Sequence, residues 1–408
     1  MDAEVPKPGQ WPVDPQEDQP ILKERIWVDG CFDFAHHGHA GALLQARQLG
    51  SELYVGIHSD EAITENKGPT VMTLDERVAA VDACRWVTKP VPHAPYVTYL
   101  PWISHYGCQY VVHGDDITSD ASGEDCYRFV KAANRFLVVK RTPGISTTDL
   151  VGRMLLCTKG HFIKSLQSEL QDSNKGPDML KRMKDYATDA TGLQPGSEVW
   201  MWKASSQAQT QLSPNAGAFE KIVSGNGPQP GQRIVYVDGG FDIFSSGHIE
   251  FLKLVNEAEQ GQAYVVAGIH DDEVINHWKG LNHPIMNIFE RGLCVLQCKY
   301  VHAVIFGAPF APLKPYLQSM PMGPVAAVYH GPTAFIPLDY DPYVDAKALG
   351  LLKQILDHPF KHVNAGEIMD RIIRGREAFE ERQRRKGQKA IGEEVARQKE
   401  LEEQKNAQ

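Results

Sequence analysis

Apolar and polar positions alternate in blocks along the chain, so that short apolar runs of strand length are followed by stretches with helical spacing. Strands are expected at residues 26–28, 51–58, 110–116 and 136–139. Helices are expected from residue 40, over 149–156, and over 74–86 with Thr73 as N-cap and Glu76 at the capping-box position. Strands that alternate with helices predict a parallel, doubly wound α/β sheet. Its ligands should bind at the carboxyl ends of the strands.

The whole pattern occurs twice. Residues 237–248 repeat the order of glycine, aromatic, aspartate and histidine positions seen at 28–39. Gly268-Ile269-His270 likewise repeats Gly56-Ile57-His58. The spacing is nearly constant, since His248 lies 209 residues after His39 and Gly268 lies 212 after Gly56. Near-constant spacing over several motifs indicates a duplicated domain.

Five segments follow from this repeat. Residues 25–160 and 233–375 form the two α/β domains. Residues 1–24, rich in Pro, Gln and Asp, are expected to be a disordered leader. Residues 161–232 are expected to be a linker, although the apolar stretch 198–202 could dock on a domain. Residues 376–408 are expected to be a charged helical tail with solvated faces.

Composition narrows the functional classes. The 408 residues are 42% hydrophobic, which suits two cores, and the formal net charge of −9 argues against a general nucleic-acid binder. Seven cysteines without a Cys-x-x-Cys pair are typical of free thiols in a reducing compartment. Residues 1–20 lack a signal-peptide pattern, and no apolar run reaches the roughly 20 residues that span a bilayer. We therefore expect a cytoplasmic protein.

The chemistry is expected to start in the stretch 28–40, which predicts a strand, a turn at Gly30 and a helix N-terminus. A helix N-terminus directs backbone N–H groups and positive dipole charge at a phosphate. His36 and His39, three residues apart, would share one helix face and donate to the same phosphates. A metal site at His36, His37 and His39 is disfavoured, because no second His/Cys group at metal spacing follows. We predict no metal ligands from the protein.

The motif His-x-Gly-His after Gly-Cys-Phe-Asp resembles the cytidylyltransferases, relatives of the class I aminoacyl-tRNA synthetases. Together with His113-Gly114-Asp115-Asp116 and the run 141–154, which opens Arg-Thr-Pro-Gly-Ile-Ser-Thr-Thr, the chain resembles the ethanolamine-phosphate cytidylyltransferase family. That family carries two tandem cytidylyltransferase domains. The resemblance covers most of residues 25–380 and implies two Rossmann-like nucleotidyltransferase domains with parallel doubly wound sheets.

The resemblance implies the reaction of CTP with phosphoethanolamine to give CDP-ethanolamine and pyrophosphate, assisted by Mg²⁺ that accompanies CTP. This reaction feeds phosphatidylethanolamine synthesis. The groups expected to act on the phosphates are His36, His39, Lys67 and Arg141. The groups expected to hold the nucleotide are Gly30, Cys31, Phe32, Arg77, Gly114, Asp115, Ile145, Ser146 and Thr147. Without the family match, Lys67 would be read as a solvent-facing lysine, and Arg77 as an exposed helix residue paired with Glu76 or Asp75.

The ammonium group of the substrate is expected near Asp116 and Tyr127, because a carboxylate and an aromatic face both attract cations. Asp33 is an alternative candidate, and an equally weighted hypothesis gives Asp33 a structural role in bracing its turn. A carboxylate that accepts hydrogen bonds would favour a primary ammonium over quaternary choline, which has no N–H.

The second repeat is altered where the chemistry would occur. Ser245 stands in place of His36, and the Arg-Thr-Pro-Gly-Ile-Ser-Thr-Thr run has no counterpart. A degenerate site is expected at Asp242, Ser245, His248, Lys279 and Arg291. The second domain is therefore expected to be structural or regulatory.

Three alternatives stay open at this point: a cytidylyltransferase that acts on phosphocholine or glycerol 3-phosphate, a non-catalytic CTP-binding regulator, and an aminoacyl-tRNA synthetase relative. The duplication argues against the phosphocholine and glycerol 3-phosphate enzymes. The intact motifs of the first repeat argue against a non-catalytic regulator, and the acidic net charge argues against a synthetase relative. The partners expected are CTP and phosphoethanolamine, with no nucleic acid. A homodimer and peripheral contact with the endoplasmic reticulum membrane are left open.

Overall fold

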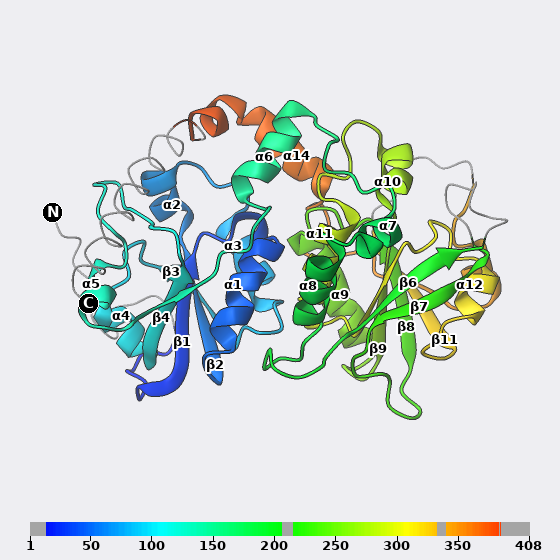
Figure 1. The fold of residues 1–408 in the computed structure, drawn as a ribbon, viewed down its shortest axis with the longest axis horizontal. Helices are drawn as coiled ribbons and strands as arrows, with labels where there is room; N and C mark the ends of the chain where they lie inside the picture. Colours follow the sequence, from blue (N-terminus) through cyan, green and yellow to red (C-terminus); the bar gives the residue numbers. More distant parts are fainter. Residues whose placement is uncertain (1–13, 206–214, 333–339, 383, 385–408) are drawn as a thin grey trace. The chain divides into compact units, whose positions relative to one another are not determined.

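The computed structural model describes residues 14–205, 215–332, 340–382 and 384, and the chain divides into two compact units. Of the described residues, unit 1 contains 14–82, 86–148, 368–382 and 384. Unit 2 contains the described residues 83–85, 149–205, 215–332 and 340–367. Each unit contains one mostly parallel sheet, so the predicted α/β class and the duplication are confirmed (Figure 1).

The sheet of unit 1 has five parallel strands in the order β3-β2-β1-β4-β5. The strands are β1 (Leu22–Gly30), β2 (Glu52–His58), β3 (Lys89–Ala94), β4 (Cys108–Gly114) and β5 (Phe136–Val139). The chain runs outward from β1 to β3 and then returns to continue from β4 to β5 on the other side. The strand order therefore reverses between β1 and β4, which is where a doubly wound sheet binds its ligands.

Helices cover both faces of this sheet (Figure 1). They are α1 (His37–Arg47), α2 (Asp60–Lys67), α3 (Leu74–Asp82), α4 (Leu100–His105) and α5 (Arg128–Ala132), with a 3₁₀ turn at Asp33–Ala35. The core on the α4 and α5 side is aromatic, with Trp27, Trp102 and Tyr106 fully buried. The predicted capping box of α3 is present, because Thr73 N donates to Glu76 Oε2 and Glu76 N donates to Thr73 Oγ1.

Unit 2 has a seven-stranded sheet in the order β12-β11-β8-β9-β10-β6-β7. Its strands are β6 (Glu198–Ala204), β7 (Gly217–Val223), β8 (Ile234–Gly239), β9 (Tyr264–Ile269), β10 (Ala303–Phe306), β11 (Val325–His330) and β12 (Leu352–Gln354). Its helices are α7 (Leu166–Gln171), α8 (Gly176–Tyr186), α9 (Ser246–Ala258), α10 (Asp272–Lys279), α11 (Ile288–Leu296), α12 (Lys314–Gln318) and α13 (Val344–Ala348). Five of the strands repeat the order found in unit 1.

The expected linker at residues 161–232 is instead largely folded in unit 2. It supplies α7, α8 and two additional strands, of which β6 is parallel to β10 and β7 is antiparallel to β6. The reason lies in the apolar stretch 198–202, because Val199, Met201 and Trp202 are buried and extend the core beside β10. The second sheet is therefore parallel except for its edge strand β7.

The boundary between the units falls inside two helices, α6 (Thr147–Leu156) and α14 (Ala365–Arg374). Most of α6 packs in unit 2, although it follows the first repeat in sequence. Most of α14, and residues 376–382 after it, pack in unit 1, although they follow the second repeat. The expected boundaries at 160 and 375 therefore differ from those of the structure.

The two ends of the chain are less loose than expected where the structure describes them. Residues 14–21 pack on unit 1, because the carboxylate of Asp18 accepts a hydrogen bond from the His105 ring and Gln19 N donates to His105 O. In the tail, Phe379 is buried. The leader residues 1–13 and the tail residues 383 and 385–408 lie outside the described residues.

Two further expectations can be compared with the structure. All seven cysteines lie in described residues and none forms a disulfide, as predicted. Within the ranges described above, no helix is both long and apolar enough to cross a bilayer.

Candidate active site

The predicted site residues of the first repeat gather in unit 1 at the carboxyl ends of β1 and β4. Gly30 ends β1, and Gly114 ends β4. The turn after β1 places Phe32 and Phe34 at φ of 54° and 65°, a conformation that costs an ordinary side chain free energy. This strained turn brings the chain sharply from the strand to the first turn of α1.

His36 and His39 share one face, as predicted. His36 is the N-cap of α1, and its ring stacks on that of His39 with centroids 4.0 Å apart. The backbone N–H of Gly38 donates to Nδ1 of His36 over 3.1 Å. Because Nδ1 accepts, a neutral His36 ring carries its proton on Nε2. The tautomer therefore leaves His36 with an N–H donor on the ring edge opposite the helix backbone.

The run 141–147 packs directly against this first turn of α1. A Cβ atom on Gly38 would lie 2.7 Å from Cγ2 of Ile145, so only glycine fits there. The hydroxyl of Thr142 donates to Gly38 O, and that of Thr147 donates to Asp33 O. Helix α6 begins at Thr147, so the N-termini of α1 and α6 meet, as predicted. Two helix N-termini at one place form a strong anion site.

The cationic side chains lie at the rim of this region. Lys67 is the last residue of α2 and is exposed, with Nζ 5.7 Å from the centroid of the Tyr96 ring. Arg141 is half exposed, and its Nη1 lies 3.8 Å from Oδ2 of Asp116, the residue expected at the ammonium group. Asp115 is also exposed at the end of β4. The charged groups of Lys67 and Arg141 stand on long flexible stems, which can reorient toward a ligand.

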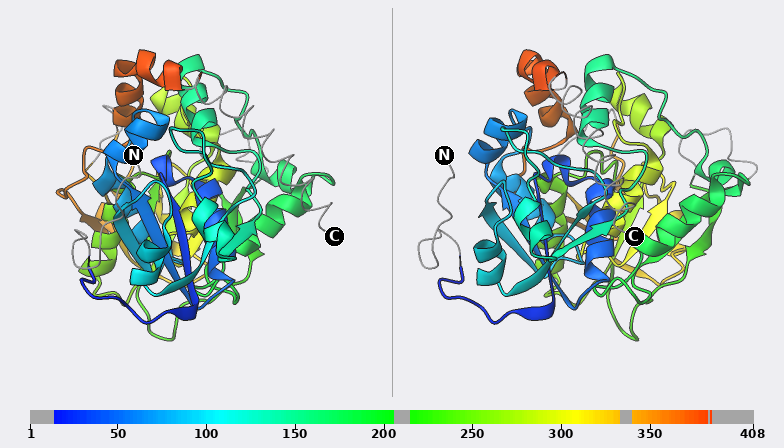
Figure 2. Two further views of the ribbon diagram at one scale, coloured as in Figure 1. Left: turned by 90° about the vertical axis from the view of Figure 1, so that its left-hand side faces the viewer. Right: turned by 60° about the vertical axis from the view of Figure 1, so that its left-hand side comes forward.

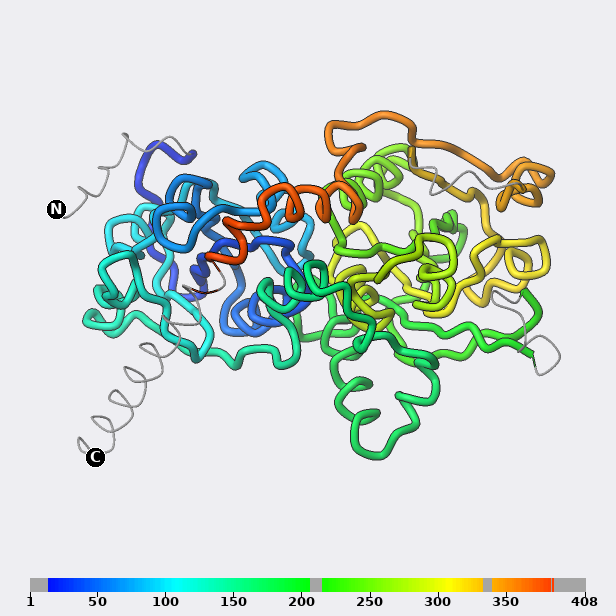
Figure 3. Tube along the Cα trace, turned by 90° about the horizontal axis from the view of Figure 1, so that it is seen from above, coloured from blue at the N-terminus to red at the C-terminus, as the bar shows by residue number. Residues whose placement is uncertain are grey.

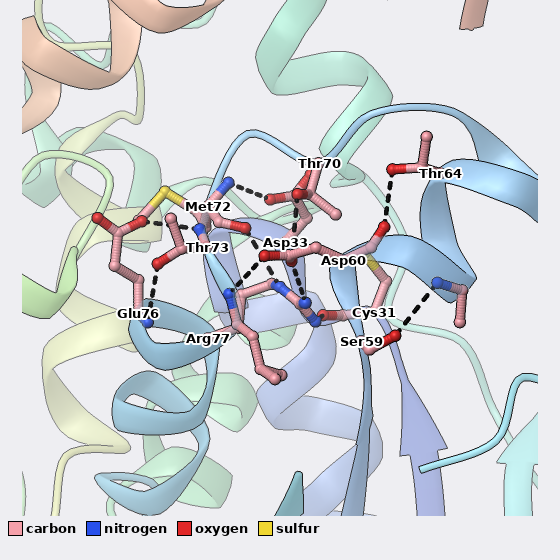
Figure 4. Close-up of polar contacts among 12 residues, drawn as sticks. Cys31, Asp33, Ser59, Asp60, Thr64, Thr70, Met72, Thr73, Glu76 and Arg77 are labelled. Carbon is pink, nitrogen blue, oxygen red and sulfur yellow. Dashed lines mark hydrogen bonds and ion pairs between the residues drawn. The ribbon is translucent and has the colours of Figure 1, made fainter. Parts of the chain in front are cut away.

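Asp33 and Arg77 have structural partners (Figure 4). The carboxylate of Asp33 is 1% exposed and accepts hydrogen bonds from Val71 N and Met72 N. This geometry favours the bracing hypothesis for Asp33 over an ammonium contact, because its donors are backbone N–H groups of the loop after α2 and a cation, Arg382, already lies 3.4 Å from Oδ2.

Arg77 is buried rather than exposed, and it pairs with neither Glu76 nor Asp75. Its guanidinium donates to Cys31 O, Met72 O and Oδ1 of Asp60 (Figure 4). Arg77 therefore fastens the turn after β1 to the loop 68–73. Burial raises the pKa of the Cys31 thiol, with the Asp33 charge adding to the effect, so Cys31 is a neutral thiol at this turn.

A residue that the sequence reasoning missed lies beside Tyr127. The carboxylate of Asp29 is 4% exposed and accepts from Tyr127 OH (2.8 Å), Trp27 Nε1 (2.8 Å) and Thr98 Oγ1 (2.6 Å). These donors are all neutral. Tyr127 also packs on the ring of His113, with centroids 4.7 Å apart. The sequence feature that points to Asp29 is its position just before Gly30, because both repeats carry an aspartate there. In unit 2 this residue is Asp238, before Gly239, and it accepts a hydrogen bond from Tyr343 OH.

The corresponding region of unit 2 is closed by its own chain. Ser245 caps α9 together with His248, and the Ser245 hydroxyl donates to Val363 O. A Cβ on Gly247 would lie 2.1 Å from that same carbonyl oxygen. A carbonyl oxygen, which repels anions, thus lies against the helix turn where unit 1 places its two histidines.

The charged residues of the degenerate site serve the fold of unit 2. Asp242 accepts from Ile285 N and Met286 N, and Arg291 pairs with Asp272 at 2.7 Å, both fully buried. Burial lowers the pKa of His248 to about 4, with the nearby Lys279 charge adding to the effect. Burial also lowers the pKa of Lys279. Asp242 and Arg291 thus reproduce in unit 2 the bracing contacts that Asp33 and Arg77 make in unit 1.

A divalent cation would find few protein ligands here. In the part of the chain that the structure describes, no three His, Cys, Asp or Glu side chains cluster closely enough to hold a metal ion. Mg²⁺ prefers oxygen ligands and readily keeps phosphate and water oxygens. The residues present therefore do not form a metal cage of their own.

Comparison with known proteins shows which family this chain resembles. The family model "Cytidylyltransferase-like" matches residues 27–153 and 236–358, so it covers both repeats. The chain is 40% identical over 389 residues to ethanolamine-phosphate cytidylyltransferase from Mus musculus, covering 92% of this chain and 91% of that protein. Identity to the protein of the same name from Dictyostelium discoideum is 40% over 379 residues, or 90% and 95% of the two chains. Choline-phosphate cytidylyltransferase A from Rattus norvegicus is 40% identical over 133 residues, 32% of this chain and 36% of that one.

The ethanolamine-phosphate relatives match through both repeats, whereas the choline-phosphate relative matches about one repeat. The resemblance found in the sequence is thereby confirmed. The chain belongs to the ethanolamine-phosphate cytidylyltransferase family, and it is a nucleotidyltransferase.

Proposed function

We propose that the chain transfers the cytidylyl group of CTP to phosphoethanolamine, giving CDP-ethanolamine and pyrophosphate, and that unit 1 performs the chemistry. The observation that carries the division of labour is the contrast between the two helix N-termini. In unit 1 the α1 terminus presents two stacked imidazoles and meets the start of α6. In unit 2 the equivalent terminus is blocked by Val363 O.

The reaction needs positioning and charge stabilisation more than proton transfer. A phosphate oxygen of phosphoethanolamine attacks the α-phosphorus of CTP, and the bond to the bridging oxygen breaks as pyrophosphate leaves. Because a phosphate monoester is largely dianionic at neutral pH, the attacking oxygen needs no general base. His36 and His39 would donate to the α-, β- and bridging phosphate oxygens, and Arg141 and Lys67 would neutralise developing charge. The phosphates of CTP would carry Mg²⁺, which would supply further charge neutralisation.

The nucleotide would lie along the strand ends. Gly30, Cys31, Phe32 and Gly114 offer backbone groups beside the base or ribose, and Asp115 offers an exposed carboxylate. Ile145, Ser146 and Thr147 would face the phosphates at the start of α6. Arg77 acts on the nucleotide only through the backbone of Cys31, which its guanidinium holds.

For the ammonium end of the substrate, we propose Asp29 with Tyr127. Asp29 is a buried carboxylate whose donors Tyr127, Trp27 and Thr98 are neutral, so its negative charge attracts a cation with N–H groups. Tyr127 and His113 add aromatic faces beside it. Asp116 lies at the rim near Arg141 and remains a second candidate.

The test is an assay of labelled CTP with phosphoethanolamine, phosphocholine or glycerol 3-phosphate as acceptor. We expect turnover with phosphoethanolamine only. His39→Ala should lower kcat/KM by about 10²–10³-fold, as expected for loss of one preorganised donor. His248→Ala, the matched change in unit 2, should alter kcat/KM by less than about threefold, because Val363 O blocks that helix terminus. Equal losses in the two variants would contradict the assignment of chemistry to unit 1, and turnover of another acceptor would contradict the substrate.

A further inference from the structure

The catalytic unit contains a segment that the sequence places after the second repeat. Residues 368–382, from α14 and the helical turn beyond it, belong to unit 1. Figure 3 shows this orange-to-red segment over the blue elements of unit 1, and Figure 2 shows its end beside α2. Ile368, Met369, Ile372 and Phe379 are buried. The segment is therefore packed as part of unit 1, not held as a solvated tail.

Arg371 of this segment forms a two-pronged ion pair with the capping-box glutamate of α3. Its Nη1 and Nη2 donate to the two carboxylate oxygens of Glu76 over 2.7 and 2.9 Å. The Glu76 side chain is 4% exposed, so the pair is largely screened from water. Nη1 of Arg371 also donates to Val71 O. A planar guanidinium fork suits this bidentate contact, which a lysine could not reproduce.

Arg382 contacts the start of the same loop. Its Nη1 donates to Pro69 O and lies 3.4 Å from Oδ2 of Asp33. Its side chain also lies over Gly68, which has a φ of +93° at the end of α2. Arg371 and Arg382 therefore hold the loop 68–73 at two points, and this loop begins directly after Lys67.

The same device occurs in unit 2 with the roles of the repeats exchanged. Arg153 of α6, which follows the first repeat, donates to both oxygens of Glu290, the capping-box glutamate of α11, over 2.8 and 2.9 Å. The helix that follows the first repeat, α6, thus supplies the arginine that binds the capping glutamate of unit 2. The helix that follows the second repeat, α14, supplies the arginine that binds the capping glutamate of unit 1. The partner of the turn aspartate differs between the units, because Asp33 lies beside Arg382 whereas Asp242 lies beside His283.

We propose that Arg371 and Arg382 are positioning residues for catalysis, which set the loop 68–73 and thereby place Lys67 against the phosphates. This inference rests on the proposed function of unit 1. It gives the second repeat a role that needs no chemistry of its own, since its last helix completes the catalytic unit. Removing Arg371 leaves the buried Glu76 carboxylate without its ion partner, which favours rearrangement of the loop.

The experiment compares Arg371→Gln and Arg382→Gln in the full chain with two controls. Arg153→Gln removes the equivalent ion pair of unit 2, and Arg374→Gln changes an exposed arginine of α14. We expect both test variants to lower kcat/KM by about 10- to 100-fold, the scale of a displaced catalytic group. Both controls should stay within about threefold of wild type.

A double-mutant cycle with Lys67→Ala distinguishes an action of Arg371 through Lys67 from a purely structural role of Arg371. If Arg371 acts through Lys67, Arg371→Gln should cost little more once Lys67 is gone, because the two changes remove one function. Hydrogen exchange should show faster exchange of the 68–73 amides in Arg371→Gln, with β1 amides unchanged. Arg371→Lys should not restore activity.

Three results would overturn the proposal: kcat/KM in the test variants equal to that of the controls, full additivity with Lys67→Ala, or unchanged exchange of the loop amides. A wild-type protein that turns over no acceptor would overturn the proposed function instead. The exchange measurement would still decide whether the arginines hold the loop.

Discussion

Asp33 offers the sharpest separation of structural from catalytic roles, because unit 2 contains its counterpart. Replacing Asp33 by Asn puts an amide group where a carboxylate now accepts from Val71 N over 3.1 Å and from Met72 N over 2.9 Å. Asn keeps one acceptor oxygen, but its NH₂ group would face a backbone N–H. The contact of Arg382 with a charged oxygen is also lost.

The magnitude follows from these contacts. Hydrogen bonds to a charged group contribute about 1.5–3 kcal/mol each, and a buried N–H left without an acceptor costs about 1–3 kcal/mol. Since Asn can keep one of the two backbone bonds, we expect Asp33→Asn to lower the free energy of unfolding of unit 1 by about 2–4 kcal/mol. Asp242→Asn removes bonds from Ile285 N (2.8 Å) and Met286 N (3.0 Å) and should weaken unit 2 by a similar amount.

The assay measures two quantities for each variant. Hydrogen exchange of the β1 and β8 amides reports the stability of each unit separately, and steady-state turnover with phosphoethanolamine reports the chemistry. We expect comparable losses of stability, each in its own unit. Only Asp33→Asn should lower kcat/KM, by about tenfold or more, because its loop follows Lys67. Full activity in a destabilised Asp33→Asn protein, or an equal loss of activity in Asp242→Asn, would refute the reasoning.

Two further predictions concern Asp29 and the pH dependence of unit 2. Asp29→Asn should lower kcat/KM for phosphoethanolamine by about 10- to 100-fold, mainly through KM, because a charge-assisted hydrogen bond of about 1.5–3 kcal/mol is lost. Asp238→Asn is the matched control in unit 2. An unchanged KM in Asp29→Asn would show that Asp29 does not contact the substrate. The pKa of His248 is lowered from 6.5 to about 4 by burial, so folded unit 2 binds this proton more weakly than the unfolded chain does. The stability that this neutral ring contributes is full above pH 6.5 and is lost as the pH falls toward 4, by up to about 3 kcal/mol. Hydrogen exchange of β8 amides between pH 7 and pH 4.5 should show this loss, and His248→Gln should reduce it; an identical pH dependence in the variant would contradict the assignment.

The sequence by itself determined the features that depend on neighbours along the chain. The alternation of apolar runs and helical spacing predicted the strands β2, β4 and β5, with Phe136–Val139 matching β5 at both ends. The three-residue spacing of His36 and His39 placed both on one helix face, and Thr73 with Glu76 formed the predicted capping box. The duplication was visible because its motifs recur at nearly constant spacing. Local geometry fixes such features, since a helix turn or a strand turn constrains residues only a few positions apart.

Only the tertiary structure decided the features that join distant residues. Nothing in the charged stretch after residue 367 indicated that Arg371 would bind Glu76, because the partners lie 295 positions apart. The same holds for β6, whose place in the second sheet depends on the edge that β10 offers. The sequence does not single out Asp29 for a related reason, since the contacts of this strand carboxylate with Tyr127, Trp27 and Thr98 form only in the folded chain. Long-range packing selects these contacts from many that the sequence allows, because burial and ion pairing depend on which surfaces meet.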